Sequence, residues 1–179
     1  MDETLARRLQ ALEDREAVRA LKAYYARCAD EKYTDDHRRR PQAEIDAIVR
    51  RQVDATFTED AVWDGGPQFG RHEGRAAIYD YLRAGGWSFA LHYFVSPVIT
   101  VDGDTAHASW MLWQPCTLTE GNRSMLMSAT TEDDYVRTGP GTGTGSGTGW
   151  RMRFMRFTLK FITPLERPWS LARNTVFAG

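Results

Sequence analysis

The sequence has few of the features that mark metalloproteins and nucleotide-binding enzymes. Its 179 residues include two cysteines, Cys28 and Cys116, which form no CxxC and show no metal-ligand spacing, so we expect reduced, partly buried thiols. No GxSxG, HExxH or Walker loop is present, and the glycines of 139–149 alternate with threonine and open no helix. The sequence therefore predicts neither a metal nor a cofactor.

Strong charge of one sign and long apolar runs are also missing. The net charge is −1, with 23 basic and 24 acidic residues, which gives no field for nucleic acid or an anionic membrane. No segment approaches the length of a membrane span, and the first residues, MDETLARRLQ, lack the apolar core of a signal peptide. We therefore expect a cytoplasmic protein that binds neither nucleic acid nor membrane.

Helical spacing of apolar residues fills the first half of the chain. Residues 1–33 are predicted to be helical, with a second helix start capped by Asp14. The apolar positions of this segment are Leu5, Leu9, Leu12, Val18, Leu21, Tyr25 and Cys28. A further helix should begin near Pro41 and end near Phe57, and another should cover 75–84, with a short strand at 61–66 between them.

Strand patterns fill the second half, at 87–101, 104–118, 123–138 and 150–163. Asp102-Gly103 predicts a hairpin turn, and Pro97 predicts a bulge or an edge in the first strand. We expect 138–149 to be a long flexible hairpin loop, and the apolar tail 164–179 to pack on the body or on a neighbouring subunit. Helices followed by an antiparallel meander indicate one α+β domain over 1–179, whose curved sheet encloses a pocket.

One histidine stands in an unexpected place. Residues 90–97 read ALHYFVSP, so His92 interrupts a run that otherwise has the pattern of a buried strand. A hydrogen-bonded core histidine is one interpretation. The other is a general base, because imidazole exists in both protonation states near neutral pH. A carboxylate on its Nδ1 would then fix the tautomer, and Asp30, at the end of the first long helix, is the candidate.

Several segments together resemble the SnoaL-like branch of the NTF2-like α+β cone fold. They are ALEDREAVRALKAYYARCAD (11–30), FTEDAVWDGG (57–66), EGRAAIYDYL (73–82), ALHYFVSPVITVDGDTAHASW (90–110) and GWRMRF (149–154). Within the branch, EGNRSMLMSATTEDDYVR (120–137) and ITPLE (162–166) look most like the hexachlorocyclohexane dehydrochlorinases. YYARCAD (24–30) resembles the bile-acid 7α-dehydratases, and scytalone dehydratases are more distant.

The resemblance implies a cofactor-free lyase and its catalytic residues. These enzymes share an aspartate late in the first long helix and a histidine on the strand after the third helix, which correspond to Asp30 and His92. The residue five before the aspartate is a catalytic tyrosine in the bile-acid enzymes, and here it is Tyr25. Its alternative role is core packing with one hydrogen bond.

The same resemblance gives candidates for substrate binding. Trp110 and Gln114 occupy positions that are catalytic in the dehydratases, and Phe94 is expected to line the pocket with them. Core packing is the alternative for Trp110. Arg156 or Lys160 should supply a late basic residue, although strand parity alone favours Met155 or Leu159 at the inward positions.

The expected function is therefore a dehydratase-like elimination on a hydrophobic, ring-containing small molecule, with His92 and Asp30 as the base pair. An isomerase or cyclase of the ketosteroid or polyketide type would use the same base. A non-catalytic binding module is a further alternative, because a fold does not fix a function. By analogy with the dehydratases, we expect a homo-oligomer, a trimer before a dimer.

Overall fold

The first long helix and a strongly curved sheet form the body of the structure, a computed structural model that describes residues 3–139 and 149–165. The helices are α1 (Glu3–Glu31), α2 (Gln42–Thr56), α3 (Gly66–Phe69) and α4 (Arg75–Ala84), with a 3-10 turn, η1 (Glu120–Asn122). The strands are β1 (Phe57–Asp64), β2 (Arg71–Glu73), β3 (Trp87–Ala90), β4 (Tyr93–Asp102), β5 (Thr105–Leu118), β6 (Ser124–Arg137) and β7 (Trp150–Pro164). The loop predicted at 138–149 and the tail predicted at 164–179 lie mostly outside the described residues.

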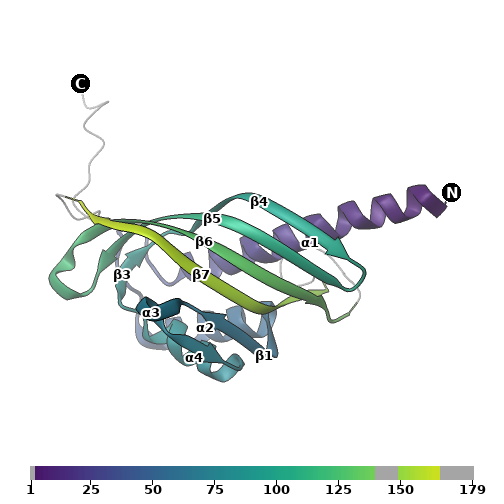
Figure 1. Ribbon diagram of the computed structural model, residues 1–179. Coiled ribbons are helices and arrows are strands. Elements are labelled where there is room, and N and C mark those ends of the chain that lie inside the picture. Colours follow the sequence, from purple (N-terminus) through teal and green to yellow (C-terminus); the bar gives the residue numbers. More distant parts are fainter. Residues whose placement is uncertain (1–2, 140–148, 166–179) are drawn as a thin grey trace.

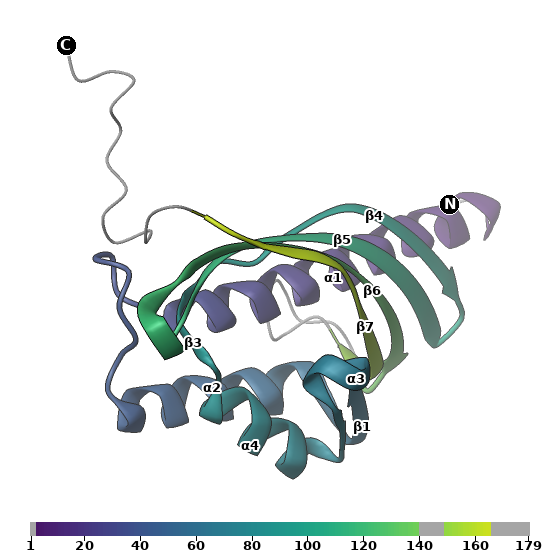
Figure 2. The same ribbon diagram turned by 60° about the vertical axis from the view of Figure 1, so that its left-hand side comes forward.

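The sheet arches over α1, and α2 and α4 lie on the far side of that helix (Figures 1 and 2). Its strand order is β2-β1-β7-β6-β5-β3, with β4 as a further partner of β5. All pairings are antiparallel except that of β1 with β7. The mostly antiparallel α+β cone that the sequence predicted is therefore present, and its concave side faces the helices.

Helix α1 is continuous where the sequence predicted a second start. Asp14 does not cap a helix but lies inside α1 and is buried. Its carboxylate accepts a hydrogen bond from Gln10 at 3.2 Å and lies 2.8 Å from a guanidinium nitrogen of Arg137 on β6. The prediction was wrong because this carboxylate binds the side chains of Gln10 and Arg137 and caps no main-chain N–H at a helix start.

The strand predicted at 87–101 is divided into β3 and β4 at Leu91 and His92. Opposite the break lies Pro115 of β5, which has no N–H to donate to the ladder. The main-chain N–H of His92 donates instead to Asp30 Oδ1, at 2.9 Å. At the break, His92 therefore leaves the strand pairing and is hydrogen-bonded to Asp30 at the end of α1. Farther along, Pro97 lies at a bulge of β4, an edge strand, as predicted.

Large apolar side chains are exposed on the outer face of the sheet. Tyr93 and Val95 of β4 pair with Trp113 and Met111 of β5, and all four are at least 40% exposed. A contiguous apolar patch of this kind is typical of protein interfaces.

The homo-oligomer, trimer before dimer, stays a prediction, and this patch is where we expect subunits to meet. Light scattering at micromolar concentration should give a trimer, which Met111→Glu converts to monomers; a wild-type monomer would contradict it.

Candidate active site

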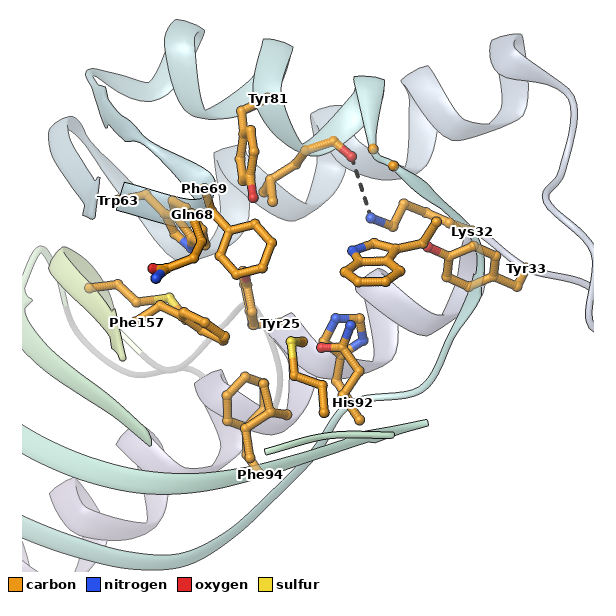
Figure 3. Close-up of a pocket in the computed structure, with 18 of the residues that line it drawn as sticks. Tyr25, Lys32, Tyr33, Trp63, Gln68, Phe69, Tyr81, His92, Phe94 and Phe157 are labelled. Carbon is orange, nitrogen blue, oxygen red and sulfur yellow. Dashed lines mark hydrogen bonds between the residues drawn. The ribbon is translucent and has the colours of Figure 1, made fainter. Parts of the chain in front are cut away.

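A cavity of about 360 Å³ lies between the helices and the concave side of the sheet. Most of its lining is aromatic or aliphatic. In Figure 3, Lys32, Tyr33 and His92 lie on one side, Trp63, Gln68, Phe69 and Phe157 on the other, and Tyr25 lies between them. This is the size and composition of a pocket for a small hydrophobic molecule, with few polar groups to orient it.

His92 and Asp30 form a hydrogen-bonded pair at the cavity wall. His92 Nδ1 lies 2.8 Å from Asp30 Oδ1, which also accepts the main-chain N–H of His92 at 2.9 Å. An ionised carboxylate only accepts hydrogen bonds, so the proton of the neutral imidazole lies on Nδ1 and Nε2 keeps its lone pair. The His92 side chain lines the cavity and is 16% exposed. The predicted contact is present, and its catalytic use stays a prediction.

Tyr25 reaches the same cavity from α1, five residues before Asp30. Its ring packs edge-on against Phe57 at 5.9 Å and its side chain is 5% exposed. Burial raises the pKa of Tyr25 well above that of a free phenol, and the neighbouring Tyr81 raises it further. Tyr25 is therefore a neutral hydroxyl that can donate a hydrogen bond, and it is not a phenolate base.

One further hydrogen-bond donor in the wall, the indole N–H of Trp63, was not found from the sequence. Trp63 of β1 is 5% exposed, and its Nε1 has no hydrogen-bond partner within the described residues. Its ring lies 4.6 Å from that of Tyr81 on α4. The backbone of Gly65 passes so close to Trp63 that a Cβ there would come within 2.3 Å of the indole. Glycine at 65 was the available signal, since it marks a close approach.

A buried ion pair lies behind the aromatic wall. Lys22 Nζ is 2.6 Å from Asp133 Oδ2 and 3.2 Å from Thr131 Oγ1, and Tyr135 donates to the same Asp133 oxygen at 2.8 Å. Both ionic side chains are at most 1% exposed. Burial lowers the pKa of Lys22, although Asp133 opposes that effect. The ammonium lies 4.1 Å from the ring centroid of Phe94, so this pair supports a wall residue from the rear.

The four predicted substrate-binding residues are not all at the cavity. Phe94 and Gln114 line it. Trp110 points inward, but it is buried core, with its ring centroid 5.9 Å from Lys22 Nζ, and does not line the cavity. The alternative of core packing is therefore correct for Trp110.

Arg156 was wrongly predicted to face the pocket. Its side chain is 58% exposed on the outer face and its Nε lies 3.7 Å from Asp64. The neighbouring Met155 is buried and lines the cavity, as parity alone indicated. Lys160, the other basic candidate, is also exposed on β7. Because side chains alternate between the two faces of a strand, 155 and 156 cannot both point inward.

No metal site or membrane helix accompanies this cavity in the part of the chain that the structure describes. No three His, Cys, Asp or Glu side chains gather there in a way that could hold a metal ion. None of the described helices is both long enough and apolar enough to cross a bilayer.

Comparison with known proteins agrees with the fold. The chain is similar to the hexachlorocyclohexane dehydrochlorinase LinA Type2, with 19% identity and a TM-score of 0.71 over 93% of this chain and 98% of the other. It is similar to LinA-type3 from Novosphingobium barchaimii LL02, with 20% identity and a TM-score of 0.68 over 88% and 94%. A candidate scytalone dehydratase from Novosphingobium aromaticivorans DSM 12444 is similar at 16% identity and a TM-score of 0.61, over 97% and 100%.

The search among curated proteins found no match. The profile of the SnoaL-like domain matches residues 44–156, which include β1, α4, His92 and most of the sheet. This match covers more than half of the chain, and the curved sheet over α1 is the arrangement that the resemblance implied. The chain therefore belongs to the SnoaL-like domain family, with the NTF2-like α+β fold.

Proposed function

We propose that the protein is a cofactor-independent lyase that eliminates a small group from a hydrophobic, ring-containing molecule. The observation that carries the proposal is the hydrogen bond of 2.8 Å between His92 Nδ1 and Asp30 Oδ1 at the wall of an aromatic cavity. Asp30 holds the imidazole so that Nε2 can act as a base, and it stabilises the imidazolium that forms. The dehydrochlorinase and dehydratase names among the similar structures support the same reaction class.

The reaction needs only one base and one hydrogen-bond donor from this chain. His92 Nε2 takes a proton from a carbon next to an activating group, and the C–H electron pair becomes the new double bond. The leaving group departs with its own electron pair, and the Tyr25 hydroxyl, which is neutral because its pKa is raised, donates a hydrogen bond to it. The proton on His92 balances the charge of the departing anion and is released with it.

A panel of ring compounds tests this proposal. Each compound should carry a hydroxyl or halide on the carbon next to an acidic C–H, and mass spectrometry should detect loss of water or of the hydrogen halide. Tyr25→Phe should slow the elimination less than His92→Ala, since Tyr25 assists departure and does not take the proton. Rearrangement without loss of mass, with deuterium taken up from D₂O, would contradict elimination and favour an isomerase. Tight binding with no turnover of any compound would favour a binding module.

A further inference from the structure

Lys32, the residue after α1, is an unpaired cation in the cavity wall. It lines the cavity and is 8% exposed (Figure 3). Its Nζ donates one hydrogen bond, to the main-chain oxygen of Leu82 at 3.3 Å. Within the described residues, no carboxylate lies at ion-pair distance from it. The ring centroid of Tyr33 lies 5.9 Å from Nζ, but it carries no negative charge. A buried charge without an anionic partner is costly, so its presence in a mostly apolar cavity calls for an explanation.

Support of the α4 C-terminus does not explain Lys32. Leu82 lies in the last turn of α4, where a cation is favourable. Arg39 already serves that end, because its guanidinium donates to the main-chain oxygens of Arg83 at 2.6 Å and Gly85 at 3.3 Å. One hydrogen bond also leaves two of the three N–H groups of the Lys32 ammonium without an acceptor among the described residues.

The charges around the cavity indicate the kind of group that Lys32 can bind. Lys22 is neutralised by Asp133, and Arg39 is engaged by Gln42 and the two carbonyls of the α4 end. Asp30 already holds His92. The charges of Arg39 and Asp30 are opposite in sign, and the hydrogen bonds of both groups are taken up within the protein. One positive charge with free N–H groups, that of Lys32, therefore remains for a ligand, which matches one negative charge. A carboxylate carries that charge at neutral pH, whereas a phenol, which ionises near pH 10, does not.

We propose that Lys32 binds the carboxylate of the substrate, so that the ligand of this cavity is a ring-bearing carboxylic acid. The role of the acid as a substrate rests on the proposed function, whereas its binding does not. In Figure 3, Lys32 and His92 lie on the same side of the cavity, with Trp63 and Phe157 opposite. An acid group at Lys32 therefore fixes which part of the ring system faces His92, and Lys32 determines specificity without taking part in proton transfer.

The binding test uses two probes of nearly the same shape, 2-naphthoate and the neutral 2-naphthamide. Calorimetric titration at pH 7 should show that the wild-type protein binds naphthoate about 10–100-fold more tightly, the range expected for a hydrogen bond to a charged group. Lys32→Met should remove this preference and leave the affinity for naphthamide unchanged. Lys160→Met is the matched control, because Lys160 is exposed on β7 and its loss should change neither affinity.

The pH dependence gives a second measurement on the unmodified protein. Burial and, to a smaller extent, Arg39 lower the pKa of Lys32 to about 8, against the opposing effect of Asp30. The ammonium is therefore charged at pH 7 and largely neutral at pH 9.5, so the preference for naphthoate should shrink between these values. His92 and Tyr33 also line the cavity. Naphthamide measured at both pH values therefore controls for changes at those groups.

The results separate this inference from the proposed function. Equal binding of the two probes by the wild-type protein, binding of neither, or a preference retained by Lys32→Met would overturn the role of Lys32. Elimination from neutral ring compounds together with equal binding of the probes would overturn the role of Lys32 and would still support the lyase. A naphthoate preference that depends on Lys32, in a protein that eliminates nothing from any ring acid, supports the binding site and contradicts the lyase.

Discussion

Asp133→Ala should lower the free energy of unfolding by about 3–5 kcal/mol, the cost of leaving one member of a buried ion pair without its partner. Asp133 is fully buried, and its Oδ2 meets Lys22 Nζ at 2.6 Å and the Tyr135 hydroxyl at 2.8 Å. Among the described residues, its removal leaves the Lys22 ammonium with one oxygen acceptor, the Thr131 hydroxyl. Because domains of this size are stable by about 5–15 kcal/mol, the variant should be close to unfolding at 37 °C. Urea denaturation measures the change.

Variants of both Lys22 and Asp133, together with a surface control, distinguish the cost of an unpaired buried charge from a general loss of packing. Lys22→Met alone should also destabilise the protein, because it leaves Asp133 charged and buried. The double variant, Lys22→Met with Asp133→Ala, should cost clearly less than the sum of the two single variants. Glu16→Ala, which breaks the exposed pair of Glu16 and Arg19, should leave the urea midpoint unchanged. Additive losses in the double variant would mean that Lys22 and Asp133 do not stabilise each other.

His92→Ala should reduce the turnover of an accepted substrate by about 10²–10⁴-fold, the range typical of a general base. Asp30→Asn should also remove most activity, because the amide has no charge to stabilise the imidazolium and its N–H can donate to Nδ1, which favours the wrong tautomer. Two residues that act as a unit are strongly non-additive, so the double variant should lose little more than the worse single variant. The measurement is kcat/KM for the wild-type protein, the two single variants and the double variant.

The chain contains a matched control for that cycle. His107 Nδ1 lies 2.8 Å from Asp134 Oδ1, the same distance as in the His92–Asp30 pair, but His107 is 54% exposed on the outer face of the sheet. Its pKa is raised by the hydrogen bonds that its ring donates to the Asp134 and Glu132 carboxylates. His107→Ala and Asp134→Asn should leave turnover unchanged. If the control pair reduces turnover as much as the cavity pair, the loss does not report catalysis at His92.

The parts of the site that could be predicted from the sequence depend on local pattern and on resemblance. His92 was noticed because a histidine is unusual in an apolar strand, and Asp30 because it ends the first long helix, where the resemblance implies a catalytic aspartate. Parity placed Met155 inward and contradicted Arg156, whose assignment came from the family resemblance. Pattern was the better guide at that strand because alternation of side chains is a property of the backbone itself.

The remaining polar residues of the site depend on distances across the fold, which pattern alone does not give. Lys22 follows Leu21 and lies four residues after Val18, on the buried stripe of α1. Asp133 lies at an inward position of β6, between Thr131 and Tyr135. Two opposite charges on inward faces were therefore visible in the sequence as candidates for a pair. Lys32 could not be found in this way, because it lies past the end of the helix, where the period no longer applies.

The measurement that tests the central claim most directly is the deuterium kinetic isotope effect on kcat/KM, with substrate labelled at the carbon that loses the proton, which is adjacent to the carbon that bears the leaving group. If His92 removes that proton in the step that limits the rate, the labelled substrate should react more slowly with the wild-type protein. The residual reaction of His92→Ala should be slower by the factor given above. Full turnover by His92→Ala, with no isotope effect in either protein, would contradict the assignment of His92 as the base.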